Sequence, residues 1–370
     1  MDHQPAIFEV MSQPKFYPHP VDHVDSRETH ISKLFLTGAY VYKIKKPLNL
    51  GFLDFTTLEN RKHFCHEEVS LNRRLSTGVY LEVTSVSFHD GRYFPDETGN
   101  VVEYAVKMKQ LPEEDSMEMR LRGHRIGLKE IETLARKLSD FYDHAEAGDE
   151  IDSFGSWEVV NGNCEENFSQ IQSHMPSLSG TDLFQIIRST TRSFLQRRKE
   201  LFNQRIRNGK IRDCHGDLRC DHIYFTDGIQ IIDCIEFNTR FRFSDVTCDL
   251  AFLSMDLDFL GFPEISEALI RSYVQVSGDS DTYVLMDFYK CYRAMVRAKV
   301  NALRCTELDV DNRLHRITEK EAQKYLDIAY HCAIRFSRPT LWIVFGMPAS
   351  GKSTVAKELS GILDIEVLRS

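Results

Sequence analysis

The sequence of 370 residues predicts an α+β fold in which a small strand-rich part precedes a larger helical part. Up to about residue 110, apolar runs alternate with turn residues, which is typical of strands. From about 113 to 335 the apolar residues instead recur at helical spacing. One segment with strand character, 211–233, interrupts the helical part. We therefore expect two lobes, covering residues 1–110 and 111–335.

The amino-terminal lobe is predicted from its strands and one helix. The expected strands cover residues 33–36, 39–45, 82–88 and 101–108. Thr37 and Gly38 separate the first two strands and indicate a hairpin. The helix between the second and third strands has one face that carries Phe64, Glu68, Leu71 and Leu75.

The helical lobe is predicted from apolar stripes and helix ends. A first amphipathic stripe consists of Leu128, Ile131, Leu134, Leu138 and Phe141. A longer helix is expected to begin near Thr181 and to end at Gly209, because the first is a capping residue type and the second a helix terminator. Two further helices are expected around residues 281–305 and 312–335.

The most informative stretch runs from His215 through Gly216 and Asp217 to His222. It leads into two β-branched runs, 223–226 and 229–232, separated by Asp-Gly. That dipeptide is a strong hairpin signal because both turn positions need a positive φ. With a two-residue loop, His222 would lie directly opposite Asp233, with Cβ atoms roughly 5 Å apart.

This layout is the one that kinases use for phosphoryl transfer: a histidine-x-aspartate loop, a polar residue five positions later, a hairpin and a second aspartate. We interpret Asp217 as the catalytic base; the alternative is a loop aspartate that makes a turn bond. Asp233 is interpreted as a magnesium ligand because an unpaired carboxylate at the end of a buried strand would be costly. His215 is expected to brace the loop. His222 is expected to bond the loop or a phosphate, with metal ligation as the alternative.

These residues resemble the aminoglycoside phosphotransferase and choline kinase branch of the protein-kinase-like fold, in which the catalytic loop has the sequence His-Gly-Asp. The resemblance covers residues from about 28 to 300. The sequence also looks like bacterial two-domain proteins in which such a pair of lobes is joined to a P-loop ATP-binding domain. This narrower resemblance is based on Lys43 to Pro47, Gly51 to Phe55, Asp233 to Asn238 and a glycine-rich loop near the carboxyl end.

The resemblance implies roles for further residues. Lys43 matches the strand lysine that contacts the α- and β-phosphates, and Lys45 is the alternative on the same strand face. If neither lysine is functional, it would be a solvated charge on an edge strand. Glu68 matches the helix glutamate that pairs with that lysine. Glu236 is implied as a contact for a second metal or the substrate. Asp249 matches an aspartate that braces the catalytic loop, and a role as a helix N-cap is an equal alternative for this residue.

A second phosphate-binding motif begins after Pro339. The run from Gly346 to Ser353 fits G-x-x-x-x-G-K-[ST], between an expected strand at 341–345 and a helical pattern. The residues expected to bind nucleotide are Gly346, Ser350, Gly351, Lys352, Ser353 and Thr354. We expect residues 336–370 to be the start of a P-loop domain, truncated relative to the intact domain.

Three departures from the kinase pattern shape the functional hypothesis. No G-x-G-x-x-G loop is present and Thr29–Ser32 takes its place; His222 replaces an asparagine; and no protein-kinase activation segment follows Asp233. We predict a phosphotransferase that uses ATP and Mg²⁺ on a small hydroxylated or aminated acceptor. The alternatives are a nucleotide-binding regulatory protein and a substrate-selecting module for a P-loop kinase.

Composition excludes several other classes. A net charge of −9 argues against a general nucleic-acid or membrane-surface binder. The nine cysteines show no CxxC spacing, so we expect a reducing, cytoplasmic setting without structural zinc. No apolar run approaches the length of a membrane span, and the first residues do not resemble a signal peptide.

Overall fold

The computed structural model describes residues 3–95, 99–308, 313–337, 343–347, 349–363 and 367. The chain forms two compact units, which we call the sheet unit (1–126 with 215–242) and the helical unit (127–214 with 243–370). The segment that carries the His-Gly-Asp loop therefore groups with the amino-terminal sheet. The reason is packing: Ile232 lies against the apolar cluster formed by the sheet and its helix.

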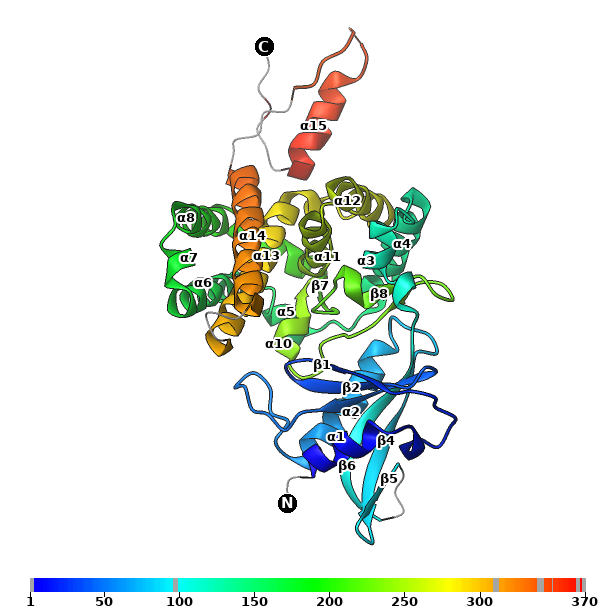
Figure 1. Ribbon diagram of the computed structural model, residues 1–370. Helices are drawn as coiled ribbons and strands as arrows, with labels where there is room; N and C mark the ends of the chain where they lie inside the picture. Colours follow the sequence, from blue (N-terminus) through cyan, green and yellow to red (C-terminus); the bar gives the residue numbers. More distant parts are fainter. Residues whose placement is uncertain are drawn as a thin grey trace. The chain divides into compact units, whose positions relative to one another are not determined.

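The sheet unit is built on six antiparallel strands in the order β1-β2-β3-β6-β4-β5 (Figure 1). They are β1 (Asp25–Glu28), β2 (Ser32–Leu36), β3 (Tyr40–Lys45), β4 (Tyr80–His89), β5 (Arg92–Phe94) and β6 (Asn100–Lys109). The predicted strands are confirmed, but the first hairpin turns one residue later than expected. Leu36 pairs with Val41, so Gly38 and Ala39 form the turn, and Gly38 has a φ of 87°.

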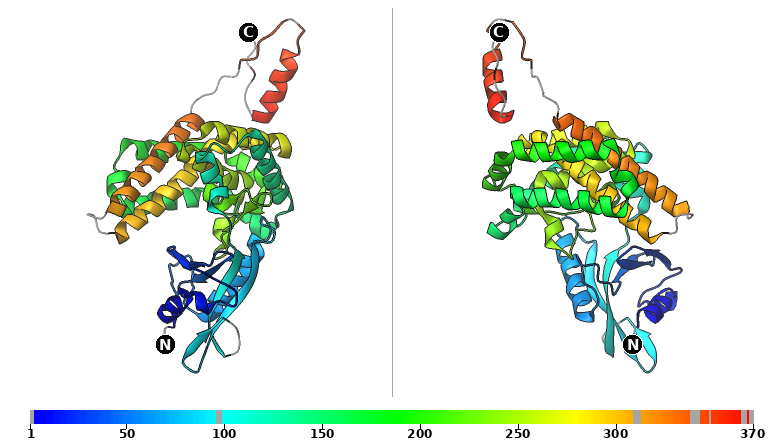
Figure 2. Two further views of the ribbon diagram at one scale, coloured as in Figure 1. Left: turned by 45° about the vertical axis from the view of Figure 1, so that its right-hand side comes forward. Right: turned by 90° about the vertical axis from the view of Figure 1, so that its left-hand side faces the viewer.

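Two helices cover opposite faces of this sheet, α1 (Gln4–Met11) and α2 (Leu58–Asn72) (Figure 2). Strand side chains alternate between faces. Tyr42 and Ile44 of β3 therefore join the cluster beneath α1, whereas Val41 joins the cluster beneath α2. Lys43 and Lys45 share the α2 face with Val41. The alternation thus brings both lysines toward the helix that carries Glu68.

The remaining elements of the sheet unit are short. They are η1 (Pro14–Phe16), η2 (Glu113–Asp115), α3 (Met117–Arg122), η3 (Cys220–His222), β8 (Ile223–Tyr224), β9 (Gln230–Ile231) and α10 (Thr239–Arg242).

The predicted two-residue loop of the β8–β9 hairpin is wrong. Tyr224 pairs with Gln230, which leaves a five-residue loop, 225–229. The Gln230 amide closes this wider loop by donating to the carbonyls of Thr226 (3.3 Å) and Asp227 (3.0 Å). Asp227 and Gly228 do have the expected positive φ, 51° and 95°. The backbone partner of His222 is consequently Ile232, whose N–H donates to the His222 carbonyl at 2.9 Å.

The helical unit contains most of the helices and one short strand pair, β7 (Ile211–Asp213) with β10 (Phe243–Asp245). Its helices are α4 (Leu128–His144), α5 (Asp149–Ser153), α6 (Trp157–His174), α7 (Pro176–Ser179), α8 (Asp182–Arg197), α9 (Lys199–Arg207), α11 (Val246–Leu260), α12 (Pro263–Ser277), α13 (Asp281–Glu307), α14 (Arg313–Ser337) and α15 (Lys352–Leu363).

Three sequence expectations are corrected in this unit. The helix expected from Thr181 to Gly209 is broken at Arg198 into α8 and α9, although the Thr181 hydroxyl caps α8 as expected by accepting from the Phe184 N–H. Leu128 is 63% exposed and does not belong to the buried stripe of α4. Asp249 is not an N-cap, because α11 begins at Val246 and Asp245 caps it.

The buried Arg205 organises the interior of the helical unit. Its guanidinium donates to both carboxylate oxygens of Asp245 at 2.8 Å and to Asp279. Asp245 in turn accepts from the Thr247 N–H at 2.8 Å and thereby caps α11. Residues 246–257 of α11 are all buried. One guanidinium therefore fixes the start of the central helix.

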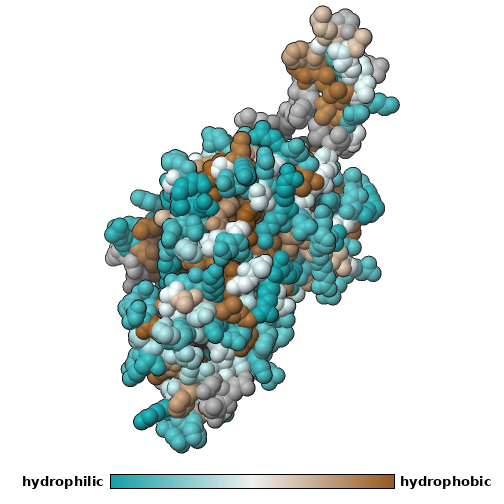
Figure 3. All heavy atoms as spheres, turned by 90° about the vertical axis from the view of Figure 1, so that its right-hand side faces the viewer, coloured by the Kyte–Doolittle hydropathy of each residue, from teal (hydrophilic) through white to brown (hydrophobic). Residues whose placement is uncertain are grey.

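Hydrophilic side chains cover most of the face in Figure 3, and hydrophobic atoms gather on the carboxyl-terminal segment that carries α15. Ile343 and Phe345 are 74% and 88% exposed. The sequence predicts a strand at 341–345. Residues 343–345 have no strand partner in the described structure, so this part of the prediction is wrong. Residues 341 and 342 lie outside the described residues. Among the helices that the structure describes, none is long and apolar enough to cross a membrane.

Removing the buried guanidinium should destabilise the protein strongly. We expect Arg205→Met to lower the free energy of unfolding by about 3–5 kcal/mol, because two buried carboxylates lose their partner. Arg207→Met is the matched control on the same helix, since Arg207 pairs with Glu200 in solvent and should contribute less than about 1 kcal/mol. Urea unfolding measures both, and equal effects would contradict the buried network.

Candidate active site

Glu68 of α2 lies between the two lysines of β3. Lys43 Nζ is 2.9 Å from Glu68 Oε1, and Lys45 Nζ is 2.6 Å from Glu68 Oε2. Glu68 and Lys45 are fully buried, and Lys43 is nearly so. The helix-face argument correctly placed Glu68 toward the sheet. The structure brings both candidate lysines onto this one carboxylate.

Each lysine also contacts a second carboxylate from the segment after β9. Lys43 Nζ donates to Asp233 Oδ1 at 2.6 Å, and Lys45 Nζ donates to Glu236. The two pairs differ in their access to solvent. The Asp233 side chain is 44% exposed, whereas those of Lys45 and Glu236 are 0% and 5% exposed.

Backbone contacts hold Asp233 in place. Its φ of 64° lies in the left-handed region that non-glycine residues seldom adopt. Its N–H donates to the Tyr80 hydroxyl at 3.2 Å, and the next N–H, of Cys234, donates to Asn72 Oδ1 at 2.9 Å. β4 and α2 therefore impose the turn that directs this carboxylate toward Lys43.

The electrostatics of the network favour the ionised forms of Lys43, Glu68 and Asp233. Burial alone would lower the pKa of Lys43, but Asp233 and Glu68 override it and hold the pKa well above its ordinary value. Burial raises the pKa of Asp233 and of Glu68. The positive charges around them, with Lys43 the largest, outweigh burial, and both pKa values lie below the ordinary range. For Glu236, burial prevails over Lys45 and raises the pKa.

His215 braces the loop that holds Asp217. The Asp217 N–H donates to His215 Nδ1 at 3.3 Å, so Nε2 carries the proton and donates to the Ile232 carbonyl at 2.9 Å. Gly216 between them has a φ of 87°, and a Cβ there would lie 2.8 Å from the Phe241 carbonyl oxygen. Glycine is therefore required at this position of the loop.

His222 connects the two aspartates of the predicted site. Its Nδ1 is 2.9 Å from the Asp217 carbonyl oxygen, and its Nε2 is 3.5 Å from Asp233 Oδ2. Nε2 is also 3.1 Å from Nη2 of Arg219, which can only donate. In this arrangement Nε2 accepts from Arg219 and Nδ1 donates to the Asp217 carbonyl. The sequence reading overlooked Arg219, whose position two residues after Asp217 was the available signal.

The donor set fits Mg²⁺ held together with phosphates rather than by the protein alone. Within the described ranges, no group of three or more His, Cys, Asp or Glu side chains could hold a metal. Asp233 offers an accessible carboxylate, whereas Glu236 is committed to Lys45 and His222 to Arg219. Mg²⁺ in phosphotransfer sites commonly takes one or two carboxylates, the substrate phosphates and water.

The loop at Thr29–Ser32 joins β1 to β2. The Thr29 hydroxyl accepts from the Ser32 N–H at 3.0 Å, and the Thr29 carbonyl accepts from Lys46 Nζ at 2.7 Å. These contacts shape a tight hairpin without glycine.

The second motif, at residues 346–354, forms a loop followed by α15, as predicted; Pro348 lies outside the described residues. Ala349 and Gly351 have φ values of 64° and 81°. Lys352 Nζ donates to the carbonyls of Gly346 (2.8 Å) and Met347 (2.6 Å). The lysine therefore folds back over its own loop, while Ser353 and Thr354 lie in the first turn of α15.

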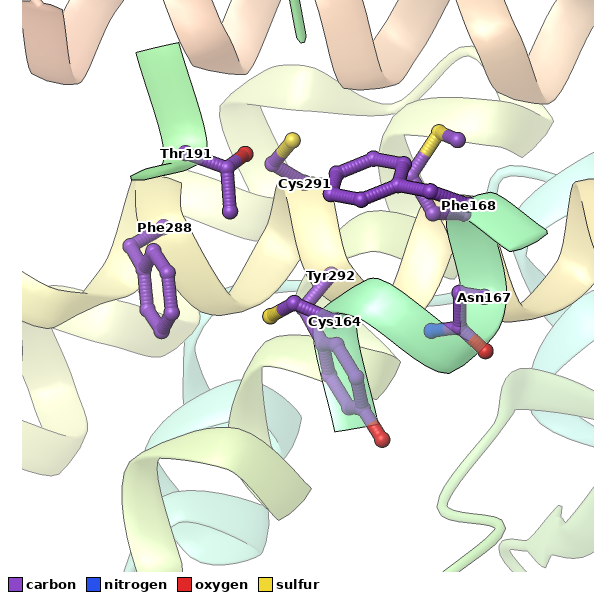
Figure 4. Close-up of a pocket in the computed structure, with 8 residues that line it drawn as sticks. Cys164, Asn167, Phe168, Thr191, Phe288, Cys291 and Tyr292 are labelled. Carbon is purple, nitrogen blue, oxygen red and sulfur yellow. The ribbon is translucent and has the colours of Figure 1, made fainter. Parts of the chain in front are cut away.

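A small cavity lies among α6, α8 and α13, and Figure 4 shows it with Cys164, Asn167, Thr191 and Cys291 at its wall. Its volume of about 10 Å³ admits at most one water molecule. Asn167 Nδ2 has no partner among the described residues. The cavity is a place for a water, and it is too small for a substrate.

Acid should weaken the contribution of Glu68 to stability. Because folding lowers the pKa of Glu68, its contribution is complete above the unfolded pKa of about 4.3 and is lost as the pH falls below that value. The difference in unfolding free energy between the parent and Glu68→Gln should therefore be largest near pH 7 and should shrink toward pH 3. Glu82→Gln, which removes an exposed pair with Lys107, is the control. A difference that grows on acidification would contradict the assignment.

Known proteins resemble the chain in sequence and in structure. No family model matches the sequence. The uncharacterized protein Rv2004c of Mycobacterium tuberculosis is 31% identical over 358 residues, which are 95% of this chain and 68% of the relative. The GDP complex of aminoglycoside 2′-phosphotransferase-IIIa superposes with a TM-score of 0.51 at 14% identity, covering 88% of this chain and 98% of that one. Choline kinase LicA from Streptococcus pneumoniae gives 0.47 at 15% identity, with coverages of 88% and 99%.

The phosphotransferase comparison confirms the expected fold, a curled antiparallel sheet lobe followed by a helical part. The chain has a protein-kinase-like fold and belongs to the same family as the mycobacterial protein Rv2004c.

Proposed function

We propose that the chain is a small-molecule kinase that transfers the γ-phosphoryl group of ATP, bound with Mg²⁺, to a hydroxyl or amino group of a small acceptor. The observation that carries this proposal is the Lys43–Asp233 ion pair, which joins a nearly buried lysine to an accessible carboxylate. Phosphates can replace Asp233 as the anion beside Lys43, and the metal can replace Lys43 as the cation beside Asp233. The exchange leaves no buried charge unpaired, which is the main cost of opening such a pair.

The same observation favours Lys43 over Lys45 as the phosphate contact. Lys45 is sealed between Glu68 and Glu236, and a phosphate could reach it only by displacing a fully buried ion pair. We therefore assign Lys45 and Glu236 to the support of the site. This replaces the expectation that Glu236 contacts a metal.

Asp217 is proposed as the base. For a hydroxyl acceptor, the acceptor oxygen forms a bond to the γ-phosphorus, the bond from that phosphorus to the bridging oxygen breaks, and ADP leaves with the bridging electrons. The acceptor proton passes to the Asp217 carboxylate. Positioning supplies most of the rate in such transfers, because there is little covalent chemistry for the protein to perform.

Asp233 would hold the metal, whose chemistry is to neutralise charge on the phosphate oxygens. His215 and His222 would keep the loop fixed against the strand that ends at Asp233. His222 suits this role because one ring nitrogen contacts the Asp217 carbonyl and the other contacts Arg219.

The loop at 346–354 is proposed as a second phosphate-binding element, supported by its complete motif and its position before α15. Nucleotide phosphates would draw Lys352 away from the Gly346 and Met347 carbonyls. The alternative functions, a nucleotide-binding regulator or a substrate-selecting module for a P-loop kinase, depend on this element. We further propose a cytoplasmic location, in keeping with nine buried cysteines that form no disulfide.

Two variants test the proposal. Asp217→Asn should bind Mg·ATP normally but reduce phosphoryl transfer by about 100-fold or more. Asp233→Asn should weaken binding of Mg·ATP by about 10-fold or more, yet bind metal-free ATP at least as well as the parent, because Lys43 loses its competing anion. Calorimetry measures binding, and slow ATP turnover with a mass-shift screen of hydroxylated compounds measures transfer.

Asp227→Asn is the control, because Asp227 is an exposed loop aspartate paired with Lys109. Turnover that survives unchanged in Asp217→Asn would refute the base assignment. A parent chain that binds nucleotide without any turnover would favour the regulatory alternative.

A further inference from the structure

Arg219 occupies an unusual position beside the proposed base. Its Nε is 3.1 Å from Asp217 Oδ1, and its Nη2 is 3.1 Å from both Asp221 Oδ2 and His222 Nε2. The side chain is only 17% exposed, and it comes from the loop directly after the catalytic aspartate. One guanidinium therefore touches the proposed base and the residue at the asparagine position.

The contact with His222 has a consequence for metal binding. An arginine side chain has no hydrogen-bond acceptor. Nε2 of His222 therefore accepts a hydrogen bond from Arg219, while Nδ1 donates one to the Asp217 carbonyl. Both ring nitrogens are thus occupied. The position from which a side-chain amide oxygen would hold a second metal instead faces a positive charge.

The charge distribution makes Arg219 a suitable substitute for that metal. In the proposed reaction, Lys43 and a metal on Asp233 would neutralise one side of a bound triphosphate, but the transferred group would approach Asp217, whose carboxylate would repel it. A cation bonded to this carboxylate offsets the repulsion. A guanidinium suits the task because it stays charged at any working pH, and a phosphate oxygen can take the place of the partly exposed Asp221 carboxylate at Nη2.

We propose that Arg219 is a catalytic residue that binds the transferred phosphoryl group and replaces the charge of a second metal, so that the site takes one divalent cation per nucleotide. This inference rests on the proposed kinase function. During transfer, Arg219 Nε keeps Asp217 Oδ1 in place while the second carboxylate oxygen receives the acceptor proton. The bond from phosphorus to the ADP oxygen breaks as the bond to the acceptor forms.

The test compares nucleotides that differ in the γ-phosphate. Calorimetry in Mg²⁺ should show that the parent chain binds AMP-PNP more tightly than ADP. Arg219→Gln keeps a donor for His222 but removes the charge; we expect at least about 10-fold weaker AMP-PNP binding and ADP binding within about 3-fold of the parent. Arg219→Lys should retain part of the AMP-PNP preference. Titration of the AMP-PNP complex with Mn²⁺, followed by electron paramagnetic resonance, should give one bound ion per chain.

Arg120→Gln is the control, since Arg120 stacks on Phe225 in the neighbouring hairpin and should leave both affinities unchanged. Thermal unfolding of every variant separates loss of fold from loss of charge. A parent that binds neither nucleotide would overturn the proposed function itself. A parent that binds both, with Arg219→Gln retaining the same AMP-PNP to ADP ratio or with two Mn²⁺ ions bound, would overturn only the role of Arg219.

Discussion

The carboxylate of Glu68, shared by two lysines of one strand, is the interaction on which the rest of the site depends. It lies fully buried between β3 and α2, and the lysines extend the network to Asp233 and Glu236 beyond the hairpin. A buried charge without a partner costs several kcal/mol, so each member of the network constrains the others. The strand, the helix and the segment after β9 are therefore held in one arrangement by five charged groups.

This network divides support of the fold and contact with solvent between two lysine–carboxylate pairs. The pair of Lys45 with Glu236 is sealed and links β3 to the segment after Asp233, whereas the pair of Lys43 with Asp233 reaches solvent. Under the proposed function, a nucleotide that enters on the exposed side would exchange ions with the second pair while the first pair keeps the backbone in place. The loop of His215 to His222 adds to this frame through Ile232 and through Arg219.

Much of this arrangement could be predicted from the sequence where local periodicity decides the outcome. Strand alternation placed Lys43 and Lys45 on one face, and helix spacing directed Glu68 toward them. The register of the β8–β9 hairpin could not be predicted, because the Gln230 side chain closes a wider loop than Asp-Gly alone implies. Two further features could not be predicted from the sequence. The sharing of Glu68 by two lysines depends on segments far apart in the chain, and the contacts of Arg219 depend on side-chain geometry.

The central claim, that Lys43 binds the nucleotide and Lys45 supports the fold, is tested most directly by comparing Lys43→Met with Lys45→Met. Urea unfolding and calorimetric titration with Mg·ATP should be measured on both. We predict that Lys45→Met loses about 3–5 kcal/mol of unfolding free energy, because Glu236 is left buried without a partner. Lys43→Met should lose less, since Asp233 can hydrate and Glu68 keeps Lys45, but its binding of Mg·ATP should fall below detection. A folded Lys43→Met protein that binds Mg·ATP as tightly as the parent would contradict the account.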